Sequence, residues 1–100
     1  MLIILWEYMA RPERLQEFET LYRPAGAWVE LFKQSPGFVG TTLMRDAKDR
    51  HRYVIADRWK SEAAYETFKR DHDVEYEKLS RKGERLHRAE HLIGRFDLEE

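Results

Sequence analysis

Three segments of the chain have residues that alternate as in β-strands, and in each segment both faces of the predicted strand are largely apolar. The segments are residues 2–9 (LIILWEYM), 38–45 (FVGTTLMR) and 51–59 (HRYVIADRW). In the third segment the pattern places Tyr53, Ile55, Asp57 and Trp59 on one face and Val54, Ala56 and Arg58 on the other. The predicted strands therefore need a cover on both sides.

A second pattern, with hydrophobic residues three and four positions apart, predicts two helical regions. The first covers residues 12–33, where Pro24 and Gly26 should kink the helix or split it in two. The second region is either one helix or two abutting ones. It starts after Ser61, which can cap its N-terminus, and runs to about residue 88.

Residues 90–98 (EHLIGRFDL) predict a fourth strand, with Leu92, Phe96 and Leu98 on one face and Ile93 on the other. The resulting order, β-α-β-β-α-β, is that of the ferredoxin-like split βαβ arrangement, an α+β fold. Its helices cover one face of a four-stranded antiparallel sheet and leave the other face bare. We expect a second copy of the sheet to cover that face in a homodimer. The apolar residues expected there are Phe38, Met44, Val54 and Ala56.

Composition excludes several classes of function. The chain has 100 residues, of which 42% are hydrophobic, and this suits a single domain over residues 1–100 with a packed core. Its 18 basic and 19 acidic residues give a net charge of -1, so no strong positive field indicates a nucleic-acid partner. The lack of cysteine suits a reducing cytoplasm. Glu7 interrupts the apolar N-terminal segment too early for a membrane span, so we expect no membrane partner.

Two stretches of the sequence carry a family resemblance. Residues 35–46 (SPGFVGTTLMRD) and 52–68 (RYVIADRWKSEAAYETF) resemble the antibiotic biosynthesis monooxygenase family, within the dimeric α/β-barrel superfamily. The shared features are a Pro-Gly-Phe turn and a third strand that ends in tryptophan before an Ala-containing helix. For oxygenase members, the resemblance implies oxidation of a small quinol-like or anthrone-like aromatic by O2, without metal or flavin. We therefore expect no cofactor.

The resemblance implies a site between the helix-facing side of the sheet and the second helical region. The expected substrate-binding residues are Tyr53, Trp59, Tyr65 and Tyr76, and the expected catalytic residues are His72 and Asp57. An imidazole is a natural base for a phenol, which favours His72. Asp57 is the next candidate, because burial among apolar side chains would raise the pKa of its carboxyl group.

These residues also have purely structural interpretations. Trp59 can be a core residue, and the hydroxyl of Tyr65 can lie at the surface. His72 can be solvated at a break in the helix. Asp57 can pair with an arginine such as Arg58 of a partner chain. The residue types alone do not decide between these interpretations and a role in chemistry.

Other functions stay open beside the oxygenase. The protein could be a non-catalytic dimeric barrel that binds a small hydrophobic ligand. Haem degradation is disfavoured, because haem-degrading members of the family are recognised by an asparagine in the first strand, where this chain has Glu7 and Tyr8. His87 and His91 have a spacing that metal ligands use, but no third ligand is apparent, so we expect no metal site.

Overall fold

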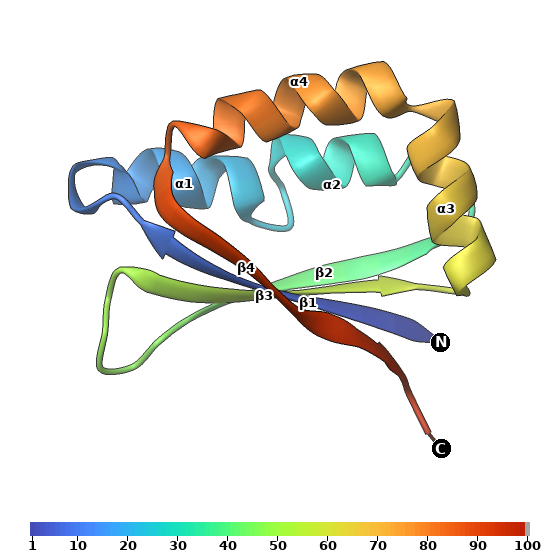
Figure 1. The fold of residues 1–100 in the computed structure, drawn as a ribbon, viewed down its shortest axis with the longest axis horizontal. Coiled ribbons are helices and arrows are strands. Elements are labelled where there is room, and N and C mark those ends of the chain that lie inside the picture. Colours follow the sequence, from blue (N-terminus) through green and yellow to red (C-terminus); the bar gives the residue numbers. More distant parts are fainter. Residues whose placement is uncertain (100) are drawn as a thin grey trace.

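Four strands form one antiparallel sheet in the order β2-β3-β1-β4 in this computed structural model, which describes residues 1–99 (Figure 1). The strands are β1 (Leu2–Ala10), β2 (Phe38–Arg45), β3 (Arg52–Trp59) and β4 (His87–Asp97). Between β1 and β2 lie a short 3-10 helix, η1 (Pro12–Arg14), and helices α1 (Leu15–Tyr22) and α2 (Ala27–Phe32). Helices α3 (Glu62–Asp71) and α4 (Asp73–Glu84) connect β3 to β4. The predicted ferredoxin-like α+β fold is confirmed.

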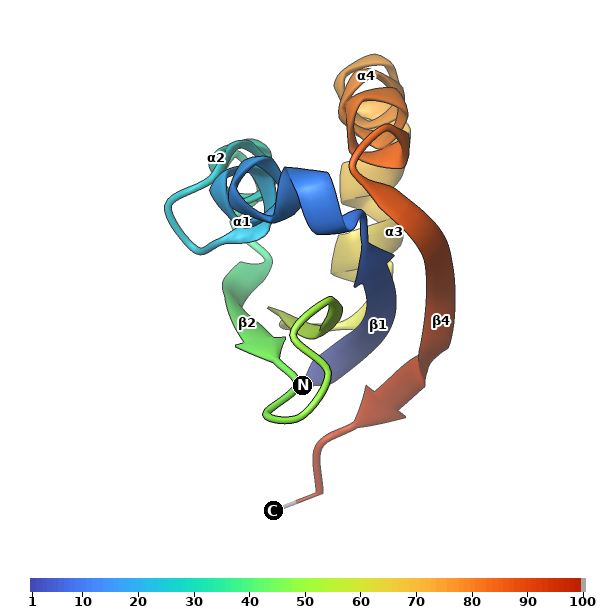
Figure 2. The same cartoon turned by 90° about the vertical axis from the view of Figure 1, so that its left-hand side faces the viewer.

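The helices lie on one side of the sheet, and the other side is left uncovered (Figure 1 and Figure 2). Both predicted helical regions are split in two. A Cβ atom at Gly26 would lie 2.5 Å from the carbonyl oxygen of Leu21, so the turn between α1 and α2 has room only for glycine. The hydroxyl of Ser61 accepts a hydrogen bond from the backbone N–H of Ala64 at 3.1 Å and caps α3, as predicted. His72 separates α3 from α4.

The core between the helices and the sheet is rich in aromatic side chains. Its most completely buried members are Trp59, Tyr53, Phe18, Phe68 and Ile4. Residues 53, 55, 57 and 59 of β3 face the helices and are buried, whereas residues 52, 54, 56 and 58 face the open side and are half-buried. The alternation predicted for this strand is therefore confirmed.

The residues of the outer strands, β2 and β4, do not all face the predicted sides of the sheet, because each of these strands contains a β-bulge. Phe38 pairs with Trp59, but the next pair along the strands is Gly40 with Arg58, so one residue of β2 is extra. The bulge turns Phe38 toward the helices, where its ring lies 5.3 Å from that of Phe32. The prediction that Phe38 belongs to the bare face is therefore wrong.

A second bulge lies in β4 and changes the faces of its apolar residues. Leu92 pairs with Trp6, which faces the helices, and the next pair is Gly94 with Leu5, so Ile93 is the extra residue. Phe96 then pairs with Ile3 on the open side. Leu92 and Phe96 thus point to opposite sides of the sheet, and the prediction that they share a face is wrong. The strand also starts earlier than predicted, at His87.

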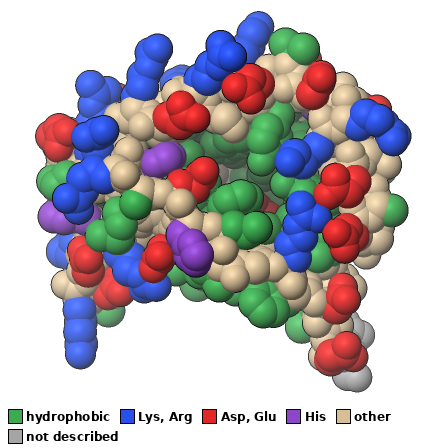
Figure 3. All heavy atoms as spheres, in the orientation of Figure 1, with side chains coloured by type: hydrophobic (Ala, Val, Ile, Leu, Met, Phe, Trp, Pro, Cys, Tyr) green, Lys and Arg blue, Asp and Glu red, His purple; other side chains and the backbone are tan. Residues whose placement is uncertain are grey.

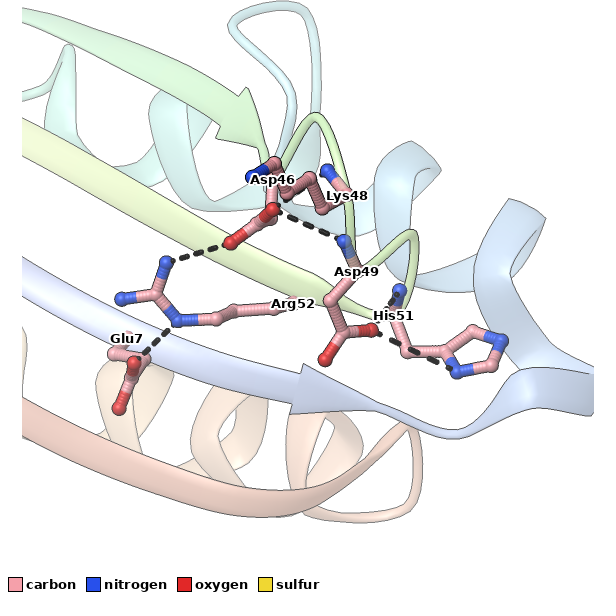
Figure 4. Close-up of polar contacts among 6 residues, drawn as sticks. All are labelled: Glu7, Asp46, Lys48, Asp49, His51 and Arg52. Atoms are coloured by element: carbon pink, nitrogen blue, oxygen red, sulfur yellow. Dashed lines mark hydrogen bonds and ion pairs between the residues drawn. The ribbon is translucent and has the colours of Figure 1, made fainter.

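The open face of the sheet combines exposed apolar side chains with a cluster of ion pairs. Met44 and Phe96 are 44% and 48% exposed. At one end of this face, the Nε of Arg52 lies 2.6 Å from Glu7, and its Nη1 lies 3.0 Å from Asp46 (Figure 4). Backbone N–H groups of the β2–β3 turn and then Arg52 hold the pKa of Asp46 below its usual value. Within residues 1–99, no helix is long and apolar enough to cross a membrane.

Candidate active site

A cavity of about 200 Å³ lies between the helices and the sheet. Its lining residues are Trp6, Tyr8, Tyr22, Trp28, Phe32, Thr41, Ile55, Asp57, Tyr65, Tyr76, Ser80 and Glu90. Seven of these twelve side chains are aromatic, so the walls suit a flat, apolar ring system. The molecule is visibly hollowed between the helices and the sheet, with hydrophobic side chains inside the hollow and charged ones around it (Figure 3).

Asp57 is the buried carboxyl group of this cavity, with an exposed fraction of 7%. The hydroxyl of Thr41, which is its cross-strand neighbour on β2, donates a hydrogen bond to Oδ1 of Asp57 at 2.7 Å. Burial raises the pKa of Asp57 to about 6, and the hydrogen bond from Thr41 and the charge of Arg58 oppose that rise. At neutral pH this carboxylate is ionised, and it is a stronger base than an exposed one.

Tyr65 and Tyr76 face the cavity from α3 and α4. Burial raises the pKa of both phenols, so each is a neutral hydrogen-bond donor at neutral pH. The Nζ of Lys69 lies 5.6 Å and 5.1 Å from the centroids of these two rings. The guanidinium of Arg95 lies 5.1 Å from the ring of Tyr65. Two cations therefore flank one of the aromatic walls.

Arg95 is held in place by acidic residues of α3. Its Nη1 lies 2.9 Å from carboxylate oxygens of both Glu62 and Glu66. Lys69, by contrast, forms no ion pair with a carboxylate of residues 1–99. The free ammonium group is therefore the less neutralised of the two cations beside Tyr65.

Tyr8, Tyr22, Ser80 and Glu90 form another polar part of the cavity wall. Tyr8 and Glu90 are cross-strand neighbours on β1 and β4. Burial raises the pKa of Tyr8, and the nearby Tyr22 and Glu90 raise it further. Tyr22 stacks on Phe18 with the ring centroids 4.4 Å apart, and its hydroxyl lies where a Cβ atom at position 83 would be. Gly83 of α4 therefore makes room for Tyr22.

Three of the six predicted site residues line the cavity: Asp57, Tyr65 and Tyr76. The structure places Trp59 outside the lining, 0% exposed, with its ring 5.2 Å from that of Tyr65. The hydroxyl of Tyr53 donates a hydrogen bond to Glu19 and does not reach the cavity.

His72, the remaining predicted residue, lies at the junction of α3 and α4. Its ring stacks on Phe68 with a centroid distance of 5.1 Å and an interplanar angle of 25°. Phe68 belongs to the core, and His72 does not line the cavity. The structure thus places Asp57 in the same cavity as Tyr65 and Tyr76, and it places His72 outside that cavity.

Sequence reasoning missed several cavity residues. Trp6 and Tyr8 alternate with Ile3 and Leu5 on β1, and this pattern could have placed them on the helix-facing side. No pattern in the sequence indicated that Glu90 lines the cavity, because its position depends on the register of β4 against β1. No group of three or more His, Cys, Asp or Glu side chains among residues 1–99 could hold a metal ion.

Comparisons with known proteins agree with this fold. The family model described as antibiotic biosynthesis monooxygenase matches residues 1–75. No curated protein matches the chain.

Among solved structures, SnoaB, a cofactor-independent oxygenase from Streptomyces nogalater, superimposes with a TM-score of 0.79 at 20% identity, over 99% of this chain and 93% of that chain. PA3566 from Pseudomonas aeruginosa superimposes with a TM-score of 0.74 at 21% identity, over 99% and 94% of the respective chains. At these identities the likeness is one of fold.

Proposed function

The chain belongs to the antibiotic biosynthesis monooxygenase family, and we propose that it is a cofactor-independent monooxygenase that oxidises a small hydroxylated aromatic with O2. The proposed substrate is quinol-like or anthrone-like. The observation that carries the proposal is Asp57, a buried carboxyl group of raised pKa in the wall of an aromatic cavity. The fold shared with SnoaB, which is described as a cofactor-independent oxygenase, supports it.

The first chemical step is the transfer of a proton from the substrate to Asp57. Its Oδ1 already accepts the hydrogen bond from Thr41, so Oδ2 is the oxygen that takes the proton. The carboxyl group is strong enough as a base because burial raises its pKa to about 6. The substrate is left as an electron-rich anion within the cavity.

That anion supplies the electrons for the oxidation. It transfers one electron to O2, and the two radicals combine to form a C–O bond. The resulting peroxide anion takes back the proton from Asp57 and becomes a substrate hydroperoxide. Loss of water then leaves a ketone, so that CH2 and O2 give C=O and H2O. One oxygen atom ends in the product and the other in water. The substrate provides all the electrons, and no further reductant is needed.

The aromatic walls position the substrate and keep water from the anion. Tyr65 and Tyr76 can donate hydrogen bonds to the negative oxygen, because both phenols stay protonated. The cations of Lys69 and Arg95 near the ring of Tyr65 strengthen that hydroxyl as a donor. Trp59 supports the ring of Tyr65 from the core.

We assign the role of base to Asp57 instead of His72. A general base must come within hydrogen-bonding distance of the proton that it removes. Asp57 lines the cavity, whereas the ring of His72 stacks on Phe68. Haem is a poor fit to this proposal, because no histidine, cysteine or methionine lines the cavity, and burial raises the pKa of the four lining tyrosines, which disfavours the phenolate that would ligate iron.

We further propose that two copies pair through their open sheet faces and complete a dimeric barrel. The exposed apolar side chains of that face include Met44 and Phe96, beside the half-buried Val54 and Ala56. Covering them would lower the free energy by about 25 cal/mol per Å², and an ordinary interface covers about 800 Å² per partner. A dimer would leave the cavity of each copy on the helix side of its own sheet.

Oxygen consumption by the purified protein, treated with chelator, tests the oxygenase. The panel contains quinols, anthrones and haemin, and quenching of tryptophan fluorescence reports binding in parallel. We expect consumption with at least one quinol or anthrone, and its loss in Asp57→Asn. Binding without consumption across the panel would instead favour a non-catalytic protein that binds a small hydrophobic ligand in the same cavity.

A further inference from the structure

We propose that the cavity selects an elongated hydroxyaromatic with a hydrogen-bond-donating group at the end far from the reacting proton, and that Glu90 and Tyr8 bind this distal group. The inference rests on the proposed function, because it takes Asp57 as the place of the reaction. It concerns which aromatic is bound, and binding can be measured without turnover.

The polar cavity residues that the sheet contributes fall into two groups along the strands. Asp57 and Thr41 are cross-strand neighbours at one level. Tyr8 and Glu90 are cross-strand neighbours at another level, which is that of Tyr53 on β3. Asp57 and Tyr53 are four residues apart on the same strand. At about 3.3 Å per residue, the two levels are roughly 13 Å apart.

On the sheet side, the wall between these two levels is apolar. Trp6 and Ile55 are cross-strand neighbours and lie midway, and Trp28 and Phe32 face the cavity from α2. A ligand that reaches both polar levels must therefore place a rigid apolar body between two polar atoms. Aromatic rings meet that requirement at little cost in conformational entropy.

The separation of the two levels sets the length of the ligand. Tyr8 is on the strand next to that of Asp57, about 4.8 Å to the side, so the two positions are roughly 14 Å apart. Two hydrogen bonds of about 2.8 Å, one at each end, leave roughly 8 Å between the polar atoms of the ligand. Two hydroxyls on one benzene ring lie closer together than this. Oxygens at opposite ends of two fused rings match it, so the cavity favours a bicyclic or longer hydroxyaromatic over a simple quinol.

At the level of Tyr8 and Glu90, the cavity favours a ligand group that donates a hydrogen bond. Glu90 lies at the exposed rim of the cavity, and an ionised carboxylate only accepts hydrogen bonds. Tyr8 lies close enough for Glu90 to raise the pKa of its phenol. A hydroxyl or amino group on the ligand would be bound here, and a carboxylate would be repelled.

Two ligands that differ in one group test this inference. The affinities of 2-naphthol and 2,6-dihydroxynaphthalene are measured without oxygen, by quenching of tryptophan fluorescence, since Trp6 and Trp28 line the cavity. We expect the second hydroxyl to lower Kd by about tenfold, the effect of one hydrogen bond to a charged group. Glu90→Gln should remove most of this preference, and so should Tyr8→Phe. Glu30→Gln, on an exposed position of α2, is the control and should keep it.

Equal affinities for the two ligands would overturn the inference, as would a preference that survives Glu90→Gln or no binding of either ligand at millimolar concentration. Asp57→Asn separates this result from the proposed function. That variant should lose oxygen consumption and keep the preference for the distal hydroxyl. A preference without any oxygen consumption by the parent protein would support the binding inference and contradict the oxygenase.

Discussion

The two faces of the sheet are both largely apolar, but they differ in what covers them. On β3, Ile55 and Trp59 are buried beneath the helices, while Val54 and Ala56 of the same strand remain half-buried on the open face. The helices on the covered side leave a cavity against the sheet. On the open side, no helix of the same copy covers the sheet (Figure 1 and Figure 2). The same alternating strand thus provides both the wall of a cavity and a surface that a second copy can cover.

Acidic residues on the two faces show what this difference means for chemistry. Asp57, on the covered face, has its pKa raised to about 6 by burial. Asp46, near the open face, has its pKa lowered by backbone N–H groups and by Arg52 (Figure 4). The first carboxylate is made more basic and the second less basic. The environment of each carboxyl group therefore decides which of them can serve as a base.

The largest expected effect comes from removing Asp57, the proposed base on the covered face. Asp57→Asn keeps the shape of the side chain and an oxygen for the hydrogen bond from Thr41, but it cannot take a proton. We expect kcat to fall by about 10²-fold to 10⁴-fold in an oxygen-consumption assay. Asp46→Asn should leave kcat nearly unchanged, because Asp46 lies outside the cavity. A similar loss in both variants would contradict the assignment.

The same pair of variants should change stability in opposite directions. The pKa of Asp57 rises from 3.8 in the unfolded chain to about 6 in the fold, so the folded state binds more protons in that window. The free energy of unfolding therefore falls as the pH rises from 3.8 to about 6, and it stays lower above this window. Asp57→Asn removes that loss and should raise the free energy of unfolding at pH 7 by about 3 kcal/mol at most.

The pKa shift of Asp46 affects the free energy of unfolding in the opposite direction. Its lowered pKa stabilises the fold above the unfolded pKa, and this contribution is lost as the pH falls through the folded value. Asp46→Asn should therefore destabilise the protein at pH 7. Urea unfolding at pH 4 and pH 7 measures both effects. An Asp57→Asn variant that is less stable than the parent at pH 7 would show that burial of this carboxylate does not cost stability.

On the open face, Ala56→Glu should have the next largest effect. Ala56 faces away from the helices near the middle of β3, and a dimer through this face would bury the introduced charge. We expect the dimer Kd, measured by light scattering after gel filtration, to rise by roughly 10²-fold. Ala63→Glu on the exposed side of α3 is the matched control and should leave the dimer intact. A parent protein that elutes with the mass of one chain would contradict the dimer.

Most of the fold could be predicted from the sequence, since alternation and helical periodicity report directly on which side is buried. The faces of β2 and β4 could not, because a bulge adds one residue and reverses the sides that follow it. A signal existed in each case. Gly40 and Gly94 directly follow the extra residues, and an isolated glycine within a strand pattern is typical of a bulge.

The candidate site was only partly predictable for a similar reason. Asp57 and Tyr65 follow from periodicity within one element. His72 does not, because it stands where α3 ends and α4 begins, and the break changes the direction of the helix. Glu90 enters the cavity only through the register of β4 against β1. Long-range pairing, unlike periodicity, leaves little trace in a single sequence.

A smaller effect should come from the hydrogen bond that holds Asp57. The hydroxyl of Thr41 stabilises the carboxylate and opposes the rise of its pKa. Thr41→Val should therefore raise that pKa further and move the rising limb of the pH–rate profile to higher pH. At pH 6 the rate should fall a few-fold, and above pH 8 it should approach that of the parent. Thr42→Val, which removes a hydroxyl bonded to Arg58 on the open face, should leave the profile in place.

The smallest expected effect, in His72→Ala, decides between the two candidate bases. An imidazole group and a buried carboxyl group can both titrate near pH 6, so the pH–rate profile of the parent does not tell them apart. Because the ring of His72 stacks on Phe68 outside the cavity lining, we expect its loss to leave kcat within about twofold and the profile unchanged. The lost stacking should lower Tm slightly, which thermal unfolding measures. If a folded His72→Ala variant instead turned over about a hundredfold more slowly than the parent and lost the rising limb, the base would be His72, and Asp57 would have a structural role.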